Sequence, residues 1–282
     1  MATPIQAQVQ PIPPPSESPH PRVRRHTGFA SRFLPGERDI GVYVPSEYGE
    51  NPDRQYPLLI LQDGQNLFDP RTSFIRGKTW RVAESADDAI AAGEVEPLVI
   101  AGVANAGERR LAEYTPTRDW KLGGGEASKY SLMVTRELLP FLRAQYRLRP
   151  GTGDTGIGGS SLGGLVSLWI GLRHTDIFGR LAVLSPSVWW NHRYILAYLN
   201  GVAPELARRP RIWLDVGDQE GRRTLSDADL LHARLRKLGW RDEADLHFEA
   251  VAGGAHDEAS WAQRVRPMLR FLFPAQRLQN PP

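Results

Sequence analysis

Residues Gly158–Gly164 read Gly-Gly-Ser-Ser-Leu-Gly-Gly and contain the pattern Gly-x-Ser-x-Gly, with Ser161 at its centre. The stretch 154–159 before the serine has the pattern of a short strand, and 162–174 after it has that of a helix. A serine on a strained turn between strand and helix is the arrangement of a nucleophile elbow, where small neighbours let the backbone pass closely. We therefore predict that Ser161 is a nucleophile. The alternative is a glycine-rich turn in which Ser160 or Ser161 only caps a helix.

Strand and helix patterns alternate on both sides of this turn. Strands are predicted at 23–33, 38–45, 57–62, 97–104, 154–159, 179–185, 211–216 and 245–251, and helices at 79–92, 128–146, 162–174, 225–238 and 258–272. An opening meander followed by alternating strands and helices predicts an α/β fold: a mostly parallel, twisted sheet of about eight strands with helices on both faces. Pro267 is expected to kink or split the last helix. The stretch 186–204 is expected to be an irregular loop.

The distribution of proline predicts where the folded part begins. Seven of the 23 prolines lie in the first 21 residues and two more close the chain. Residues 1–22 are therefore predicted to form a disordered, proline-rich tail that has too little apolar surface to order. Residues 23–274 are predicted to form one catalytic domain and 275–282 a short tail. We expect removal of residues 1–20 to leave activity intact.

Composition excludes several classes of protein. No apolar run approaches the roughly 18–20 residues that span a bilayer, and no conventional signal peptide is visible, which favours the cytoplasm and leaves a periplasmic or secreted location open. The chain has no cysteine, so thiolate chemistry is excluded. Its 35 basic and 32 acidic side chains give a net charge of +3 without a basic cluster, so no nucleic-acid partner is expected. Oligomeric state is not indicated.

A serine nucleophile needs a general base, and after a nucleophile elbow the acid and then the histidine follow in the sequence. Five histidines follow the serine: His174, His192, His232, His247 and His256. His256 lies in a glycine-rich loop after the last predicted strand, where a side chain reaches back over the sheet edge, so we predict that it is the base. A solvent-exposed loop histidine is the alternative. Among the other four, His192 lies in the tryptophan-bearing loop and is a candidate for a pocket wall.

The acid that orients the base is expected in the loop after the predicted strand 211–216, which continues Gly217-Asp218-Gln219-Glu220. Two carboxylates compete in this loop. Glu220 is favoured over Asp218, because it stands three residues after the glycine, a common separation for this acid. Asp215, inside the strand, is the third candidate. Glu220 or Asp218 would accept the imidazole Nδ1–H and leave Nε2 free for the serine proton.

An oxyanion hole requires two backbone N–H groups aimed at the developing charge. Leu162, the residue after the nucleophile, is predicted to supply one of them. The other is expected from the loop after the predicted strand 57–62, where Gln65 is the first choice and Asn66 the second. Gly64 would let the chain turn tightly there. The alternative for this loop is an ordinary Asp-Gly turn.

Five segments together resemble a known family. They are Asp63–Phe68 (DGQNLF), Arg110–Pro116 (RLAEYTP), Gly159–Gly164 (GSSLGG), Ser185–Asn191 (SPSVWWN) and Gly253–His256 (GGAH). The chain resembles, over about residues 23–273, the esterase family of α/β-hydrolases, which includes enterochelin (siderophore) esterases, feruloyl and acetylxylan esterases and mycolyltransferases. The resemblance implies an α/β-hydrolase fold with Ser161 and His256 as the working pair. It also implies an acid that is Asp in some members and Glu in others.

These observations predict a serine carboxylic-ester hydrolase that works through an acyl-enzyme and needs no metal or cofactor. Its partner would be a small-molecule ester, of the siderophore type or another aromatic acyl ester. The alternatives are an acyltransferase, a carbohydrate (acetyl or feruloyl) esterase, and a catalytically silent binding protein. Trp189, Trp190 and Arg110 are predicted to contact substrate at the carboxyl edge of the sheet. Alternatively, the tryptophans wedge their loop onto the core, and Arg110 pairs with Glu113.

Overall fold

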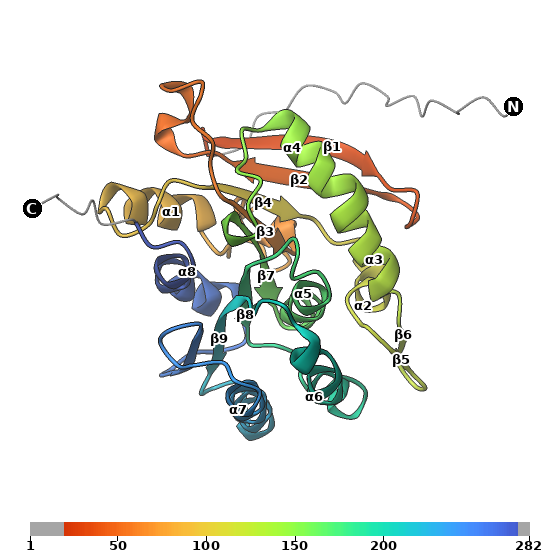
Figure 1. The fold of residues 1–282 in the computed structure, drawn as a ribbon. Helices are drawn as coiled ribbons and strands as arrows, with labels where there is room; N and C mark the ends of the chain where they lie inside the picture. The colour runs from red at the N-terminus through yellow and green to blue at the C-terminus, as the bar shows by residue number, and fades with distance from the viewer. Residues whose placement is uncertain (1–19, 276–282) are drawn as a thin grey trace, which may run out of the picture.

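The computed structural model describes residues 20–275, so the tails predicted at 1–22 and 275–282 lie almost wholly outside the described residues. The main sheet has eight strands: β1 (Val23–Ala30), β2 (Glu37–Tyr43), β3 (Leu58–Gln62), β4 (Val99–Val103), β7 (Thr155–Ser160), β8 (Arg180–Leu184), β9 (Arg211–Gly217) and β10 (Leu246–Val251). Their order is β1-β2-β4-β3-β7-β8-β9-β10. β1–β2 and β2–β4 pair antiparallel, and the neighbours from β4 to β10 are parallel (Figure 1). The predicted sheet is confirmed.

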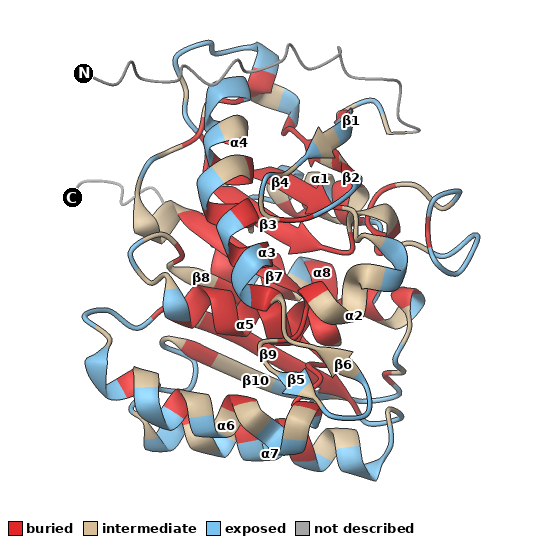
Figure 2. Ribbon diagram, turned by 90° about the vertical axis from the view of Figure 1, so that its right-hand side faces the viewer, coloured by how far each residue is buried: buried red, intermediate tan, exposed pale blue. Residues whose placement is uncertain are grey.

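Two hydrophobic cores lie on opposite faces of this sheet. The helices are α1 (Val82–Ala91), α2 (Arg110–Glu113), α3 (Ala127–Met133), α4 (Leu139–Gln145), α5 (Leu162–Arg173), α6 (Trp190–Val202), α7 (Arg222–Lys237) and α8 (Glu258–Leu272). Helices α1 and α8 pack on one face and α3 to α7 on the other (Figure 1). In β3, Leu58 and Ile60 belong to one core and Leu59 and Leu61 to the other, as the alternation of side chains along a strand requires. Central strands are therefore buried on both sides (Figure 2).

Three expectations for the helices need correction. The long helix expected at 128–146 contains a π-helical turn, Val134–Leu138, between α3 and α4. The stretch 186–204 is not an irregular loop, because it contains α6, whose first turn holds Asn191–Arg193 in left-handed backbone conformations that interrupt a regular pattern. Helix α8 is not split at Pro267, because its buried apolar side chains Met268 and Leu269 pack on the sheet and outweigh the lost hydrogen bond.

The carboxyl ends of the parallel strands meet at one edge of the sheet, and ligands of open α/β sheets bind at this edge. The loops after β3, β7, β8, β9 and β10 all leave from it. A small antiparallel hairpin, β5 (Arg118–Asp119) and β6 (Gly123–Gly124), follows α2. In residues 20–275, no helix is both long enough and apolar enough to cross a membrane.

Candidate active site

Ser161 occupies a strained turn between β7 and α5. Its backbone has φ 56° and ψ −123°, a conformation that residues other than glycine rarely adopt. A Cβ added at Gly159 or Gly163 would come within 2.9 or 3.0 Å of the Cβ of Gln62 in β3, so glycine is required on both sides of the serine. The Ser161 amide donates to Leu184 O at 3.0 Å, which fixes the turn to the end of β8. This local structure matches the predicted elbow.

The Ser161 hydroxyl lies 3.3 Å from the hydroxyl of Ser187, in the loop after β8. The same two residues are joined by a backbone bond, Ser187 N to Ser161 O, at 3.0 Å. Within residues 20–275, no hydrogen bond joins the Ser161 hydroxyl to His256. Bonds between a nucleophile and its base are often long without substrate and tighten when substrate binds.

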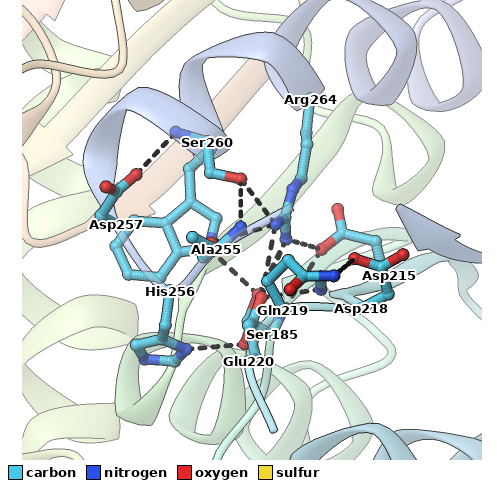
Figure 3. Close-up of polar contacts among 12 residues, drawn as sticks. Ser185, Asp215, Asp218, Gln219, Glu220, Ala255, His256, Asp257, Ser260 and Arg264 are labelled. Atoms are coloured by element: carbon cyan, nitrogen blue, oxygen red, sulfur yellow. Dashed lines mark hydrogen bonds and ion pairs between the residues drawn. The ribbon is translucent and has the colours of Figure 1, made fainter. Parts of the chain in front are cut away.

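His256 and Glu220 are brought together in the way that the sequence predicts. His256 Nδ1 lies 2.7 Å from Glu220 Oε2 (Figure 3). The imidazole is 42% exposed, whereas the Glu220 side chain is completely buried. The ring of Trp261 meets the imidazole edge-on, with centroids 4.9 Å apart. The arrangement anchors Nδ1 on the carboxylate and leaves Nε2 as the ring nitrogen available for proton transfer.

Glu220 is held ionised by donors around its carboxylate. Oε2 contacts His256, and Oε1 accepts hydrogen bonds from the Gly217 N–H at 2.7 Å and the Ser185 hydroxyl at 2.5 Å. Burial by itself raises the pKa of Glu220, but the hydrogen bonds from His256, Ser185 and the Gly217 amide outweigh it and hold the pKa below its ordinary value. The carboxylate is therefore charged at neutral pH although it is shielded from water.

The two other candidate acids have different partners. Asp218 Oδ1 accepts from the Gly253 N–H at 2.9 Å and thereby braces the loop that carries His256. Asp215 is fully buried and accepts from Trp213 Nε1 at 2.7 Å and Arg264 Nη1 at 2.9 Å. Burial raises the pKa of Asp215 to about 6. Among the three carboxylates, only Glu220 contacts His256 within the described residues.

The predicted oxyanion donors lie in a short 3₁₀ turn and at the start of helix α5. Gln65 belongs to a short 3₁₀ turn, Gly64–Asn66, and its side-chain oxygen accepts from the Asn105 N–H at 3.1 Å. Leu162 is the first residue of α5. Neither amide donates a hydrogen bond to another part of residues 20–275, so both are available for a ligand. The Asn66 amide, the second choice, already donates to Asp63 O at 2.9 Å.

The three predicted substrate contacts differ in exposure. Trp189 is 37% exposed, whereas Trp190 is buried and donates from Nε1 to Thr117 O at 3.1 Å, under the β5–β6 hairpin. Arg110 does not pair with Glu113; its Nε and Nη2 bond both oxygens of Asp63, at 2.7 and 2.8 Å. The Arg110 side chain is 28% exposed.

Three of the four remaining histidines beyond the elbow have partners away from Glu220. His174 lies 2.9 Å from the Ser131 hydroxyl, and burial lowers its pKa. His232 bonds Asp242, and His247 stacks on Trp213 with centroids 4.2 Å apart. His192 lies in the left-handed first turn of α6.

The sequence analysis missed three residues that surround Glu220: Ser185, Trp261 and Arg264. Ser185 and Arg264 are buried, and both contact the Glu220 carboxylate (Figure 3). Arg264 lies on the face of α8 that carries Trp261, Val265 and Met268. An arginine at a core-facing position of an amphipathic helix is the sequence signal that could have indicated a buried acidic partner.

The strand order and the serine elbow after β7 define an α/β-hydrolase. A model of the family described as "Putative esterase" matches residues 31–272, so the chain belongs to this family. The predicted resemblance is confirmed, and with the esterase-named relatives it makes the protein a carboxylic-ester hydrolase.

Individual relatives are moderately similar. Bacillus subtilis "Uncharacterized protein YbbA" is 23% identical, over 89% of this chain and 98% of its own. Iron(III) salmochelin esterase of Escherichia coli O6:H1 is 29% identical over 84% of this chain, which spans 55% of that enzyme's length. The structure of enterobactin esterase from Shigella flexneri superposes with a TM-score of 0.70 at 22% identity, covering 92% of this chain and 60% of that one.

Proposed function

We propose that the protein hydrolyses carboxylic esters through an acyl-enzyme formed on Ser161, with His256 as base and Glu220 as the acid that orients it. The observation that carries the proposal is the 2.7 Å contact between His256 Nδ1 and the buried Glu220 carboxylate, next to a serine in a strained elbow. A charged acid fixed on Nδ1 selects the tautomer that a serine nucleophile needs.

The reaction proceeds in two halves. Ser161 Oγ attacks the ester carbonyl carbon as its proton passes to His256 Nε2, and the N–H groups of Gln65 and Leu162 stabilise the oxyanion. The tetrahedral intermediate expels the alcohol, which takes the proton from His256, and leaves the acyl group on Ser161. A water molecule, deprotonated by His256, then attacks the acyl-enzyme. The acyl–Oγ bond breaks, Ser161 Oγ takes the proton back from His256, and the acid is released. The Ser161 hydroxyl first turns from Ser187 to His256, a side-chain rotation that is fast compared with turnover.

For the substrate, we propose an ester with an aromatic acyl group, of the siderophore type or a related one. Trp189 lies two residues after Ser187, which contacts Ser161, and is partly exposed, so it offers a face for an aromatic ring; its ring centroid lies 5.8 Å from that of the buried Trp190. Arg110 keeps its Nη1 outside the pair with Asp63 and can meet an anionic group. Similarity to salmochelin and enterobactin esterases supports this substrate class. A cytoplasmic location stays a prediction.

The test compares wild type with Ser161→Ala on p-nitrophenyl acetate. Loss of about 10³-fold or more in kcat is expected, because the covalent step is removed. A fluorophosphonate probe should label the wild type at Ser161 and leave the variant unlabelled. An unchanged rate, or no labelling, would overturn the proposal and favour a silent binding protein. Product analysis with added glycerol or sugar separates hydrolysis from acyl transfer.

A further inference from the structure

Three polar neighbours determine where the hydroxyl proton of Ser185 points. Its Oγ lies 3.1 Å from Trp261 Nε1, 2.8 Å from Arg264 Nη1 and 2.5 Å from Glu220 Oε1. The indole and the guanidinium carry donors only, so the hydroxyl oxygen accepts from both. Its own proton is left for the third neighbour, the Glu220 carboxylate. Ser185 is thus an obligatory donor to Glu220.

The backbone of Ser185 holds this hydroxyl in place. The residue follows β8, the strand between β7, which leads to Ser161, and β9, which leads to Glu220. Its amide donates to Asp215 O at 2.9 Å, and its φ is 42°, in the left-handed region. The side chain is buried, with 1% of the residue exposed. A non-glycine residue in such a conformation is kept by the contacts around it.

Arg264 extends the same cluster to the histidine loop. It is 2% exposed and bonds Asp215 at 2.9 Å, Ser260 Oγ at 2.9 Å and the carbonyl of Ala255 at 3.2 Å. Its Nη2 lies 3.3 Å from Glu220 Oε1. One planar guanidinium therefore joins the acid with the residue that precedes His256 (Figure 3). Its positive charge offsets two buried carboxylates that would otherwise repel each other.

We propose that Ser185 is a positioning residue for the Glu220–His256 pair, and that Arg264 and Trp261 fix the direction of its hydroxyl. This inference rests on the proposed function. The Ser185 proton and the Gly217 amide hold Oε1, so that Oε2 faces His256 in one orientation. Without the hydroxyl, Oε1 keeps the Gly217 amide and the longer contacts with Arg264, so the carboxylate is held less firmly and the imidazole is directed less precisely toward Ser161. The residue acts on the rate and leaves substrate affinity alone.

The test is a double-mutant cycle on kcat and KM for p-nitrophenyl acetate. Ser185→Ala, Glu220→Gln and the double variant are compared with wild type. We expect Ser185→Ala to lower kcat about tenfold with KM unchanged, because one hydrogen bond to a charged group is lost. In the Glu220→Gln background the same change should alter kcat less than twofold, since no carboxylate remains for the hydroxyl to orient against His256. An equal loss in both backgrounds, or no loss, would overturn the proposal.

Two further variants separate positioning from folding. Ser185→Gly also removes the hydroxyl, but glycine suits a φ of 42°, so its backbone is less strained than that of Ser185→Ala, and it should still lose about tenfold in kcat. Ser131→Ala is the matched control, because it removes a buried hydroxyl that contacts His174, and its kcat should match wild type. If Ser185→Gly retains full kcat, the proposal fails. The outcome with Ser161→Ala separately decides the proposed function.

Discussion

Asp63 and Arg110 form a two-point ion pair beside the oxyanion loop, with Nε–Oδ1 at 2.7 Å and Nη2–Oδ2 at 2.8 Å. Asp63 itself has a left-handed backbone (φ 56°) and precedes the turn that contains Gln65. Its Oδ1 also accepts from Asn105 Nδ2 at 2.7 Å. The pair therefore fixes the course of the backbone between β3 and the proposed oxyanion donor, Gln65.

Replacing Arg110 should separate this structural role from a substrate contact. Arg110→Met is expected to lower kcat on a neutral acetyl ester about tenfold, because Asp63 loses two charged hydrogen bonds. If Nη1 also binds substrate, KM for an ester with an anionic acyl group should rise further, by about tenfold. Arg110→Lys keeps the charge without the planar fork and serves as the matched variant. Equal kinetics for Arg110→Met and wild type on both esters would contradict both roles.

Glu220 and Asp218 provide a direct comparison of the two candidate acids. Glu220→Gln should lower kcat by about 10²–10⁴-fold, because an amide cannot hold the Nδ1–H tautomer as a carboxylate does. Asp218→Asn keeps an oxygen for the Gly253 N–H, so its kcat should stay within about twofold of wild type. Steady-state kinetics on one ester measure both. The reverse order of effects would move the acid to Asp218.

Trp189 and Trp190 should behave differently although they are neighbours. Trp190→Ala removes a buried indole and its bond to Thr117, so we expect a loss of about 3–5 kcal/mol and a fall in Tm of about 10 °C. Trp189→Ala should leave Tm nearly unchanged and raise KM for an aromatic acyl ester by about tenfold relative to an acetyl ester. Calorimetry and kinetics with both esters check the pair. A KM ratio that Trp189→Ala leaves unchanged would remove Trp189 from the substrate site.

Glu258 should make stability depend on pH. It is 4% exposed, its Oε1 accepts from Asn66 Nδ2 at 3.3 Å, and Oε2 has no partner among residues 20–275. Burial raises the pKa of Glu258 in the folded state, so the fold favours the protonated acid. The stability from this group is complete below the unfolded pKa of about 4.5 and is lost as pH rises through the folded value.

The variant Glu258→Gln should therefore be more stable than wild type at pH 8, by about 1–2 °C in Tm, because it removes a buried charge. The difference should shrink toward pH 4, where wild type is protonated. Thermal unfolding at both pH values measures it. A Tm difference that is constant with pH would show that Glu258 ionisation does not matter for the fold.

The sequence predicted the parts of the site that depend on local pattern. Ser161 is a candidate because of the glycines within three residues of it. His256 and Glu220 are candidates because each follows one of two successive strands, β10 and β9. Ser185 and Arg264 were not predicted, because their role depends on contacts across 35 and 44 residues with Glu220. The helical period places Arg264 on the core-facing side of α8, but it does not identify Glu220 as the partner.

The fold was predicted because its strands have a clear local pattern. Single elements were predicted wrongly where local sequence rules compete with tertiary packing. Buried apolar runs such as β3 identify parallel strands directly. Helix α6 was missed because Asn191–Arg193 break its first turn, and Pro267 was given too much weight because the helix around it is held by the core. Tertiary packing outweighs propensity at both places.

β10 is the outermost strand of the sheet, paired only with β9 in the described chain, and most of its residues are partly or fully exposed. The loop that carries His256 begins where β10 ends. Opening of this one strand therefore removes the proposed base while Ser161, in the sheet centre, stays in its elbow. Catalytic activity then depends on the free energy of local opening at this edge of the sheet, which is smaller than the free energy of global unfolding. On heating, turnover would fail at a lower temperature than the fold.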